Sequence, residues 1–143
     1  MAIPEELSNE AALTALIVGE AANQELLGKI AIACVARNRV EDSRWPDTYL
    51  DVIFQPMQFS CFNGLQGLDK QIPPSIWQRY FLHHWKELWW RECRFAAHGA
   101  LRSYYADVTG GANHYFATYI ETPYWAKDQT PTCRIGDHVF YRL

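Results

Sequence analysis

Two consecutive segments with the helical spacing of apolar residues place the strongest constraint on what this chain can fold into. In the first segment Leu13, Leu16 and Ile17 form one apolar stripe, and the helix is predicted to end near Gly19. The second segment is predicted to be helical over residues 24–39. Its apolar face consists of Leu27, Ile30, Ala31, Cys34 and Val35. The N-terminal part of the chain is therefore expected to supply two core helices.

A glutamate follows the apolar part of the first segment directly. In the stretch TALIVGEAANQE, residues 14–25, Glu20 comes after Leu16, Ile17 and Val18, with no nearby Lys or Arg to neutralise it. Apolar surroundings and the negative C-terminal end of a helix both disfavour an ionised carboxylate. We therefore expect Glu20 to keep its proton near neutral pH, which is what a catalytic acid requires.

Capping residues and prolines mark the start of the first helix and predict two further helices. Ser8 is expected to cap the first helix, and Thr48 to cap a short helix that ends before Pro56. The sequence PPS, residues 73–75, opens a long helix that we predict over residues 76–101. The apolar stripe of this helix includes Trp77, Tyr80, Phe81, Trp85, Leu88 and Trp89.

After Arg102 the sequence changes from helix-forming residues to turn-forming and strand-forming ones. In DVTGGANHYFAT a Gly-Gly turn precedes the alternating β-forming residues 114–118, and HVFYRL, residues 138–143, predicts a second strand. We therefore predict an α+β fold that is mostly helical, with a small antiparallel β-hairpin near the C-terminus. With 143 residues, the chain has the size of a single catalytic domain, residues 1–143.

Charge and composition argue against several classes of protein. The formal net charge of −3 argues against electrostatic binding of nucleic acid. No apolar stretch approaches the roughly 20 residues of a membrane-spanning helix, so no stable membrane association is expected. The N-terminus MAIPEELSNEAAL lacks the features of a signal peptide, which predicts synthesis in the cytoplasm. We expect a monomer.

The cysteines and histidines do not show metal-binding spacings. The four cysteines, Cys34, Cys61, Cys93 and Cys133, form no C-x-x-C pair, so free and mostly buried thiols are expected. The sequence leaves open whether Cys61 and Cys133 form a disulfide. The five histidines lack H-E-x-x-H or another compact ligand pattern, so we predict neither a metal nor another cofactor. Cys61, in the loop QFSCF, is the candidate nucleophile if the chain is a cysteine enzyme.

Four blocks of the sequence resemble the SleB/CwlJ-type cell wall hydrolase family in their order and spacing. They are GEAANQELLGKIAIACVARNRV, WPDTYLDVIFQPMQFS, DVTGGANHYF and IGDHVFY. The resemblance implies a lysozyme-like fold related to lytic transglycosylases, and it matches the catalytic glutamate of the family to Glu20. Many relatives carry another glutamate four residues later, where this chain has Gln24. Either that second acid is dispensable, or the neighbouring Glu25 replaces it.

The resemblance also implies a reaction on the glycan strands of peptidoglycan, between N-acetylmuramic acid and N-acetylglucosamine. One glutamate would donate a proton to the leaving oxygen and then remove one from the 6-hydroxyl of muramic acid, which leaves a 1,6-anhydro ring. This route needs no catalytic aspartate, so Asp107 is expected to cap the DVTGG turn through its side chain. A hydrolytic muramidase outcome, which uses a second carboxylate, stays open.

Five further residues are candidates for contact with the substrate. Gln58 and Ser60 lie in a loop that relatives place along the cleft; hydrogen bonds within the loop are the alternative. His114 and Tyr115 begin the predicted strand and should point to opposite faces. Tyr115 is expected toward the substrate, because the matching family position is usually aromatic. Trp125 is a candidate for stacking on a sugar ring, with ordinary packing of the indole as the alternative.

The expected biological setting is a bacteriophage endolysin. Such a protein accumulates in the host cytoplasm and reaches the cell wall after another protein permeabilises the membrane. A spore germination enzyme is the second setting. Two other classes stay open, a peptidoglycan amidase or peptidase that uses Cys61 and a non-catalytic module that binds the wall or belongs to the virion.

Overall fold

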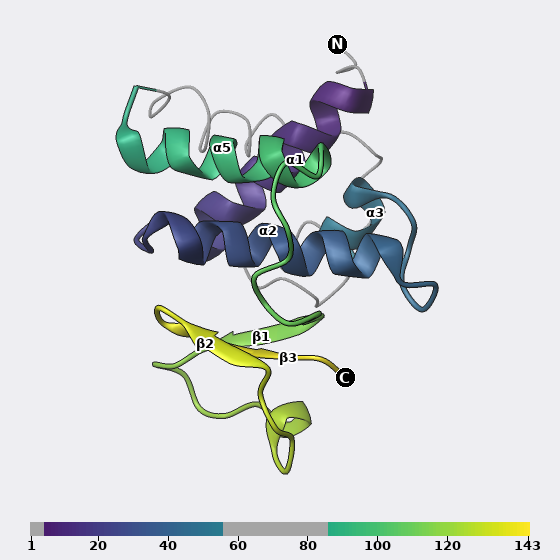
Figure 1. Cartoon of the computed structure of the whole chain (residues 1–143), viewed down its shortest axis with the longest axis vertical. Helices are drawn as coiled ribbons and strands as arrows, with labels where there is room; N and C mark the ends of the chain where they lie inside the picture. Colours follow the sequence, from purple (N-terminus) through teal and green to yellow (C-terminus); the bar gives the residue numbers. More distant parts are fainter. Residues whose placement is uncertain (1–4, 56–85) are drawn as a thin grey trace.

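The computed structural model describes residues 5–55 and 86–143 of the chain. Within these residues, helices form one part of the molecule and a small antiparallel sheet lies beneath them (Figure 1). The helices are α1 (Glu5–Ala21), α2 (Leu26–Glu41), α3 (Tyr49–Ile53), α5 (Leu88–Leu101) and the 3-10 helix η3 (Tyr124–Ala126). The strands are β1 (His114–Ala117), β2 (Cys133–Ile135) and β3 (His138–Tyr141).

The first helix has the buried stripe that the sequence predicts, but different ends. Leu13, Leu16 and Ile17 of α1 are fully buried against the other helices. The helix begins at Glu5, so Ser8 lies inside it and the prediction that Ser8 caps it is wrong. It also continues through Gly19 to Ala21, because a single glycine weakens a helix without ending it.

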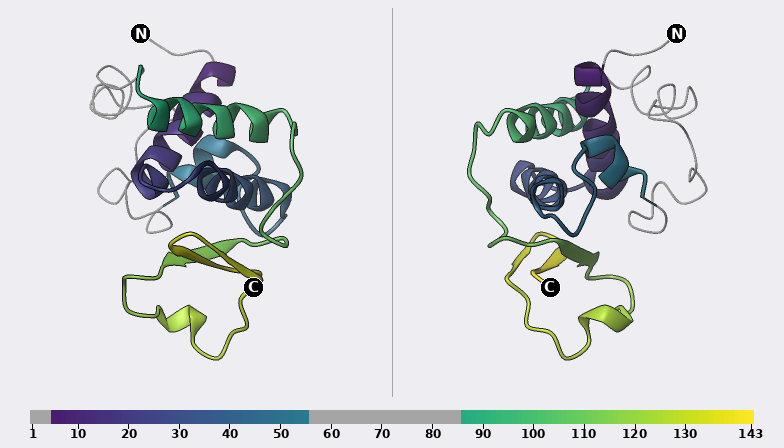
Figure 2. Two further views of the ribbon diagram at one scale, coloured as in Figure 1. Left: turned by 60° about the vertical axis from the view of Figure 1, so that its left-hand side comes forward. Right: turned by 90° about the vertical axis from the view of Figure 1, so that its right-hand side faces the viewer.

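The second helix, α2, is buried on more than one face. It packs against α1 and α5 on one side, and it contacts the sheet on the other, as two views from the side show (Figure 2). Its central residues 31–37 are therefore all buried. Lys29, just before them, is buried as well. The predicted apolar face holds for Ala31, Cys34 and Val35, whereas Leu27 is exposed.

The structure corrects the prediction of one long helix over residues 76–101. Residues 76–85 lie outside the described residues, and α5 begins only at Leu88, because Glu87 has an extended backbone with φ −79° and ψ 141°. The buried face is also shifted along the helix and consists of Trp90, Cys93, Ala96, Ala97 and Ala100. These residues recur every three or four positions, and all of them after Trp90 have small side chains, which let α5 approach α1 and α2 closely. Leu88, which we expected in the stripe, is exposed.

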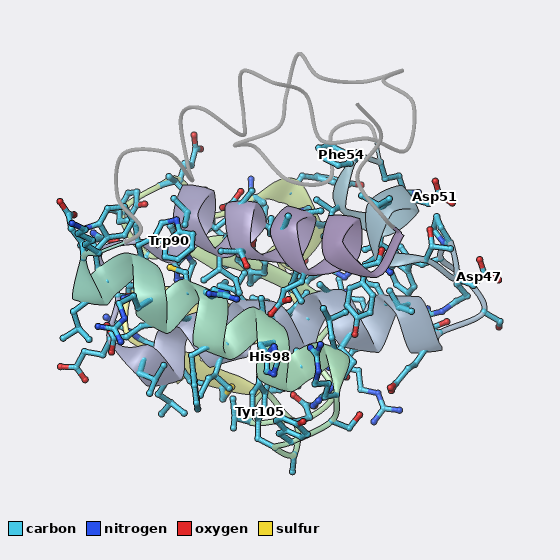
Figure 3. The ribbon with its side chains drawn as sticks, turned by 90° about the horizontal axis from the view of Figure 1, so that it is seen from above. Asp47, Asp51, Phe54, Trp90, His98 and Tyr105 are labelled. Carbon is cyan, nitrogen blue, oxygen red and sulfur yellow. The ribbon has the colours of Figure 1, made fainter. Side chains whose placement is uncertain are left out.

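Polar side chains add links between the helices. Lys29 of α2 has a side chain that is 1% exposed, and its Nζ lies 3.1 Å from Oε1 of Glu92 on α5. His98 Nδ1 of α5 lies 2.7 Å from Oε1 of Glu10 on α1. Figure 3 looks onto these helices from above and labels Trp90 and His98, both on α5. The charge of Lys29 is thus placed inside the helical core with one carboxylate beside it.

The strands that the sequence predicts pair as expected, but they are not joined by a hairpin turn. In the described residues the strand order is β1-β3-β2, with both neighbours antiparallel to β3. Tyr115 lies opposite Phe140 in this register. The tight turn instead joins β3 to β2, a strand of three residues that the prediction missed, and it uses Gly136 at φ +57°.

The C-terminal end of α2 holds the entrance to β1. Asn38 Nδ2 donates to the carbonyl of Ala112 at 2.8 Å, and Arg39 Nε donates to the carbonyl of Asn113 at 2.7 Å. Burial lowers the pKa of Arg39 to about 10, and the neighbouring Tyr115 acts in the opposite direction. The guanidinium therefore stays charged at neutral pH.

One smaller prediction is also tested by the described residues. Thr48 caps α3 as predicted, since its hydroxyl accepts a hydrogen bond from the Asp51 N–H at 3.2 Å. None of the helices within residues 5–55 and 86–143 has both the length and the apolar character needed to cross a bilayer.

Candidate active site

The candidate acid Glu20 lies in the last turn of α1, where the sequence predicts it. Its side chain is partly buried. The last turn of the described helix contains no basic residue, and the N–H of Gln24 donates to the carbonyl of Ala21 at 3.0 Å as the helix ends. Glu20 therefore stands at the negative end of the helix, close to the linker that leads into α2.

The first residue of β3, His138, is the titratable group that the structure adds to this region. The residue is 3% exposed, and its ring meets the ring of Tyr115 edge-on, with centroids 5.4 Å apart. Burial lowers the pKa of His138, while the carboxylates of Glu20 and Asp137 act in the opposite direction. The imidazole is therefore uncharged at neutral pH and lies within electrostatic reach of Glu20. Its place in the IGDHVFY block is the sequence signal that points to this residue.

Tyr115 lies on the face of the sheet that packs against the helices. Its ring contacts both His138 and Phe140, and the side chain packs against the buried core. His114, the preceding residue, points to the opposite face, as the alternation of a strand requires. Of the predicted substrate residues that the structure describes, Tyr115 is the one on the same face as His138.

His114 and Trp125 belong to a separate aromatic cluster on the other face of the sheet. Their ring centroids are 5.0 Å apart, and Trp125 also meets Phe116 and Tyr141 edge-on. Burial lowers the pKa of His114 to about 4, and the nearby guanidinium groups of Arg39 and Arg44 act in the same direction. The ring of His114 also meets that of Trp45 edge-on, with centroids 5.9 Å apart. These contacts group His114 and Trp125 with each other on the face opposite Tyr115 and His138.

The remaining predicted contacts, Gln58 and Ser60, lie outside the described residues, as does Cys61. Of the described cysteines, Cys34 and Cys93 are buried, as predicted. Burial is the main cause that raises the pKa of the Cys34 thiol to about 11 and that of the Cys93 thiol to about 12. Both thiols stay protonated at neutral pH and are unsuited to nucleophilic attack.

Asp107 has the structural role that the sequence predicts. Its Oδ1 accepts hydrogen bonds from the N–H and the hydroxyl of Thr109, at 2.9 and 2.6 Å. Its Oδ2 accepts from the N–H of Gly111 at 2.6 Å and from Asn38 Nδ2 at 3.3 Å. Burial acts to raise the pKa of Asp107, but these hydrogen bonds outweigh it and the pKa lies below its ordinary value of 3.8. The carboxylate therefore fixes the turn that leads into β1.

We expect an Asp107→Ala variant to lose about 2 kcal/mol of unfolding free energy, because four hydrogen bonds lose their acceptor. Since the folded-state pKa is lowered, this stabilisation is present above the ordinary pKa and disappears as the pH falls through the folded value. Urea unfolding between pH 3 and pH 7 measures both effects. An Asp107→Asn variant that keeps its fold but loses its lytic activity would contradict the structural role.

The described residues contain one open pocket on the linker that follows Glu20. It is lined by residues 22–26 together with Lys29, Leu88, Trp89 and Glu92, and Glu20 is not among the lining residues. Within the described parts of the chain, no three His, Cys, Asp or Glu side chains come together as metal ligands would.

Fold and site together define a class of protein: a lysozyme-like domain with a glutamate at the end of a helix, close to a small antiparallel sheet. The fold matches the catalytic domain of the Bacillus cereus SleB protein, with a TM-score of 0.70 at 24% identity, over 95% of this chain and 91% of that one. It matches equally the catalytic domain of the germination-specific lytic transglycosylase SleB from Bacillus anthracis, with a TM-score of 0.70 at 24% identity, over 94% of each chain. These likenesses confirm the predicted fold class.

The chain belongs to the cell wall hydrolase family, whose model matches residues 23–141. Glu20 precedes this matched span by three residues. The chain is also 29% identical over 124 residues to a spore cortex-lytic enzyme of Halalkalibacterium halodurans and 28% identical over 124 residues to one of Bacillus cereus. Each match covers 87% of this chain, but only 32% and 40% of those relatives.

Proposed function

We propose that this chain cleaves the glycan strands of peptidoglycan between N-acetylmuramic acid and N-acetylglucosamine, with Glu20 as acid and base. The observation that carries the proposal is the position of Glu20 at the end of α1, within electrostatic reach of the buried, uncharged His138. The helix end and the buried imidazole place Glu20 where the local potential can favour either protonation state. Its carboxyl group is therefore suited to gain and lose a proton during a reaction.

The engagement of two aspartates by other groups supports a mechanism with one glutamate. The carboxylate of Asp107 is saturated by the turn, and Oδ2 of Asp137 accepts a hydrogen bond from Gln24 Nε2 at 3.0 Å. A hydrolytic mechanism needs a second carboxylate as nucleophile or as base for water. With those two aspartates engaged elsewhere, the lytic transglycosylase route is favoured.

In this route Glu20 first donates its proton to the glycosidic oxygen, and the bond to C1 of the muramic acid breaks. The resulting oxocarbenium ion is attacked by the 6-hydroxyl of the same sugar, and the Glu20 carboxylate takes the proton of that hydroxyl. The products are a free 4-hydroxyl on N-acetylglucosamine and a 1,6-anhydromuramic end. Glu20 returns to its starting protonation state, and no water is consumed. The name of the Bacillus anthracis relative supports this assignment.

Mass spectrometry of digested peptidoglycan tests the reaction. We expect the purified chain to release fragments with 1,6-anhydromuramic ends. Fragments with reducing muramic acid ends would mean a hydrolytic muramidase, and those with reducing glucosamine ends a glucosaminidase. Cleavage of stem peptides with intact glycan strands would instead favour the cysteine-dependent alternative.

The biological setting is a separate part of the proposal. We infer an endolysin that is made in a host cytoplasm and acts on the wall after the membrane has been permeabilised, with spore germination as the second candidate. The relatives named as spore cortex-lytic enzymes support the second candidate. Rates on purified vegetative walls and on purified spore cortex, measured side by side, distinguish the two: an endolysin is expected to act well on vegetative walls.

A further inference from the structure

The side chain of Gln24 forms a two-point connection between the helices and the sheet. Its Oε1 accepts a hydrogen bond from the N–H of Asp137 at 3.0 Å, and its Nε2 donates to Asp137 Oδ2 at 3.0 Å. Gln24 is buried, although it lies in the linker between α1 and α2. The two residues are 113 positions apart in the sequence. This arrangement is called the Gln24–Asp137 clamp below.

Two glycines make room for the clamp. Gly136 has φ +57°, and a Cβ at this position would lie 2.3 Å from Oε1 of Gln24. A Cβ at Gly28 would lie 3.0 Å from the Cβ of Gln24. The first of these distances is impossible for real atoms, so only glycine lets the turn between β2 and β3 close onto the amide.

The clamp is attached to the candidate acid on one side and to His138 on the other. The backbone N–H of Gln24 donates to the carbonyl of Ala21, the residue after Glu20. The carbonyl of Asp137 accepts from the N–H of Thr118 at 2.7 Å, which fixes the end of β1 as well. His138 follows Asp137 directly, so any movement of the turn moves the imidazole relative to Glu20.

We propose that the Gln24–Asp137 clamp positions Glu20 and His138 relative to each other for glycan cleavage. Gln24 is thus a positioning residue, which acts through the turn and does not touch the substrate. This proposal rests on the proposed function of Glu20. It explains the amide at position 24: the side chain accepts from a backbone N–H through its oxygen and donates to a carboxylate through its nitrogen, which a glutamate that has lost its proton cannot do.

Gln24→Glu tests the clamp because it changes one group and keeps the shape. The new carboxylate would still accept from the N–H of Asp137, but it would face the Asp137 carboxylate without a proton to donate. We expect kcat to fall at least about tenfold with little change in KM, because a small displacement of catalytic groups is costly. We expect kcat to recover as the pH is lowered, since one of two facing carboxylates has a raised pKa and then supplies the missing donor.

The double variant Gln24→Glu with Asp137→Asn exchanges acid and amide and should restore kcat to near the native value. Asn23→Asp is the matched control: it adds the same charge beside the clamp and keeps the oxygen that accepts from Gln24 Nε2. Kinetics are measured well below the melting temperature of each variant, with circular dichroism to show that all are folded. A merely structural role would lower the melting temperature of Gln24→Glu but leave its kcat unchanged at the lower temperature.

The proposal is overturned if Gln24→Glu keeps the native kcat, or if the double variant is as impaired as Gln24→Glu alone. Failure of the proposed function looks different. In that case native protein and all variants release no glycan fragments, whereas melting temperatures still report whether the exchange of acid and amide restores the contact.

Discussion

A Glu20→Gln variant should cleave peptidoglycan roughly 1,000-fold more slowly than the native chain, with an unchanged melting temperature. Glutamine has nearly the shape of glutamate, but its amide can neither donate the first proton nor accept the second. Because substrate contacts elsewhere are kept, kcat should fall while KM stays close to its native value. Release of soluble anhydromuramic fragments, followed over time, measures the rate directly.

Two controls make this result specific. Glu25 is exposed in the same linker, so Glu25→Gln removes a nearby charge and should leave the rate unchanged. Cys61→Ser should also keep the native rate, whereas loss of lysis in this variant would favour the cysteine-dependent class. Native lytic activity in Glu20→Gln would show that another group supplies the proton. If the native chain binds walls but never lyses them, the module is not catalytic.

Glu92→Ala should lower the unfolding free energy by about 3 kcal/mol, which corresponds to a fall in melting temperature of roughly 10 °C. Glu92 places a carboxylate 3.1 Å from Lys29 Nζ, and the lysine side chain is 1% exposed. Removing the carboxylate leaves an ammonium group between α2 and α5 without its counter-charge. Urea unfolding at neutral pH, monitored by circular dichroism, measures the loss.

The matched control removes both charges. A double variant with Lys29→Met and Glu92→Leu should be close to native stability, because apolar side chains of similar volume replace a buried pair with little cost. Glu92→Gln should fall between the two, since the amide oxygen still accepts a hydrogen bond. Equal stability of Glu92→Ala and native protein would mean that Lys29 reaches water when its partner is removed.

Sequence patterns predict the parts of this fold that depend on local spacing. The stripe of Leu13, Leu16 and Ile17 follows directly from the 3.6-residue repeat, and it places Glu20 at the end of its helix. The turn around Asp107 is equally local, since an aspartate two residues before a threonine and four before a glycine can bond both backbone N–H groups.

Contacts between distant segments were not predictable in the same way. Nothing in the neighbourhood of Gln24 indicates that its amide bonds Asp137, and a strand as short as β2 has too few residues to show alternation. The start of α5 was misplaced because the aromatic pattern of residues 76–89 continues past Glu87, where the backbone is extended. The separation of Trp125 from Tyr115 and His138 also depends on which face of the sheet the loop before β2 covers.

The attachment of the sheet at both ends of α2 fixes the length of this helix. Gln24 holds one corner of the sheet just before α2 begins, and Asn38 with Arg39 holds the opposite corner near its end. One extra residue between these anchors would add about 1.5 Å and turn one anchor by about 100° relative to the other. The number of residues between the two anchors is therefore as strict a requirement as their chemistry.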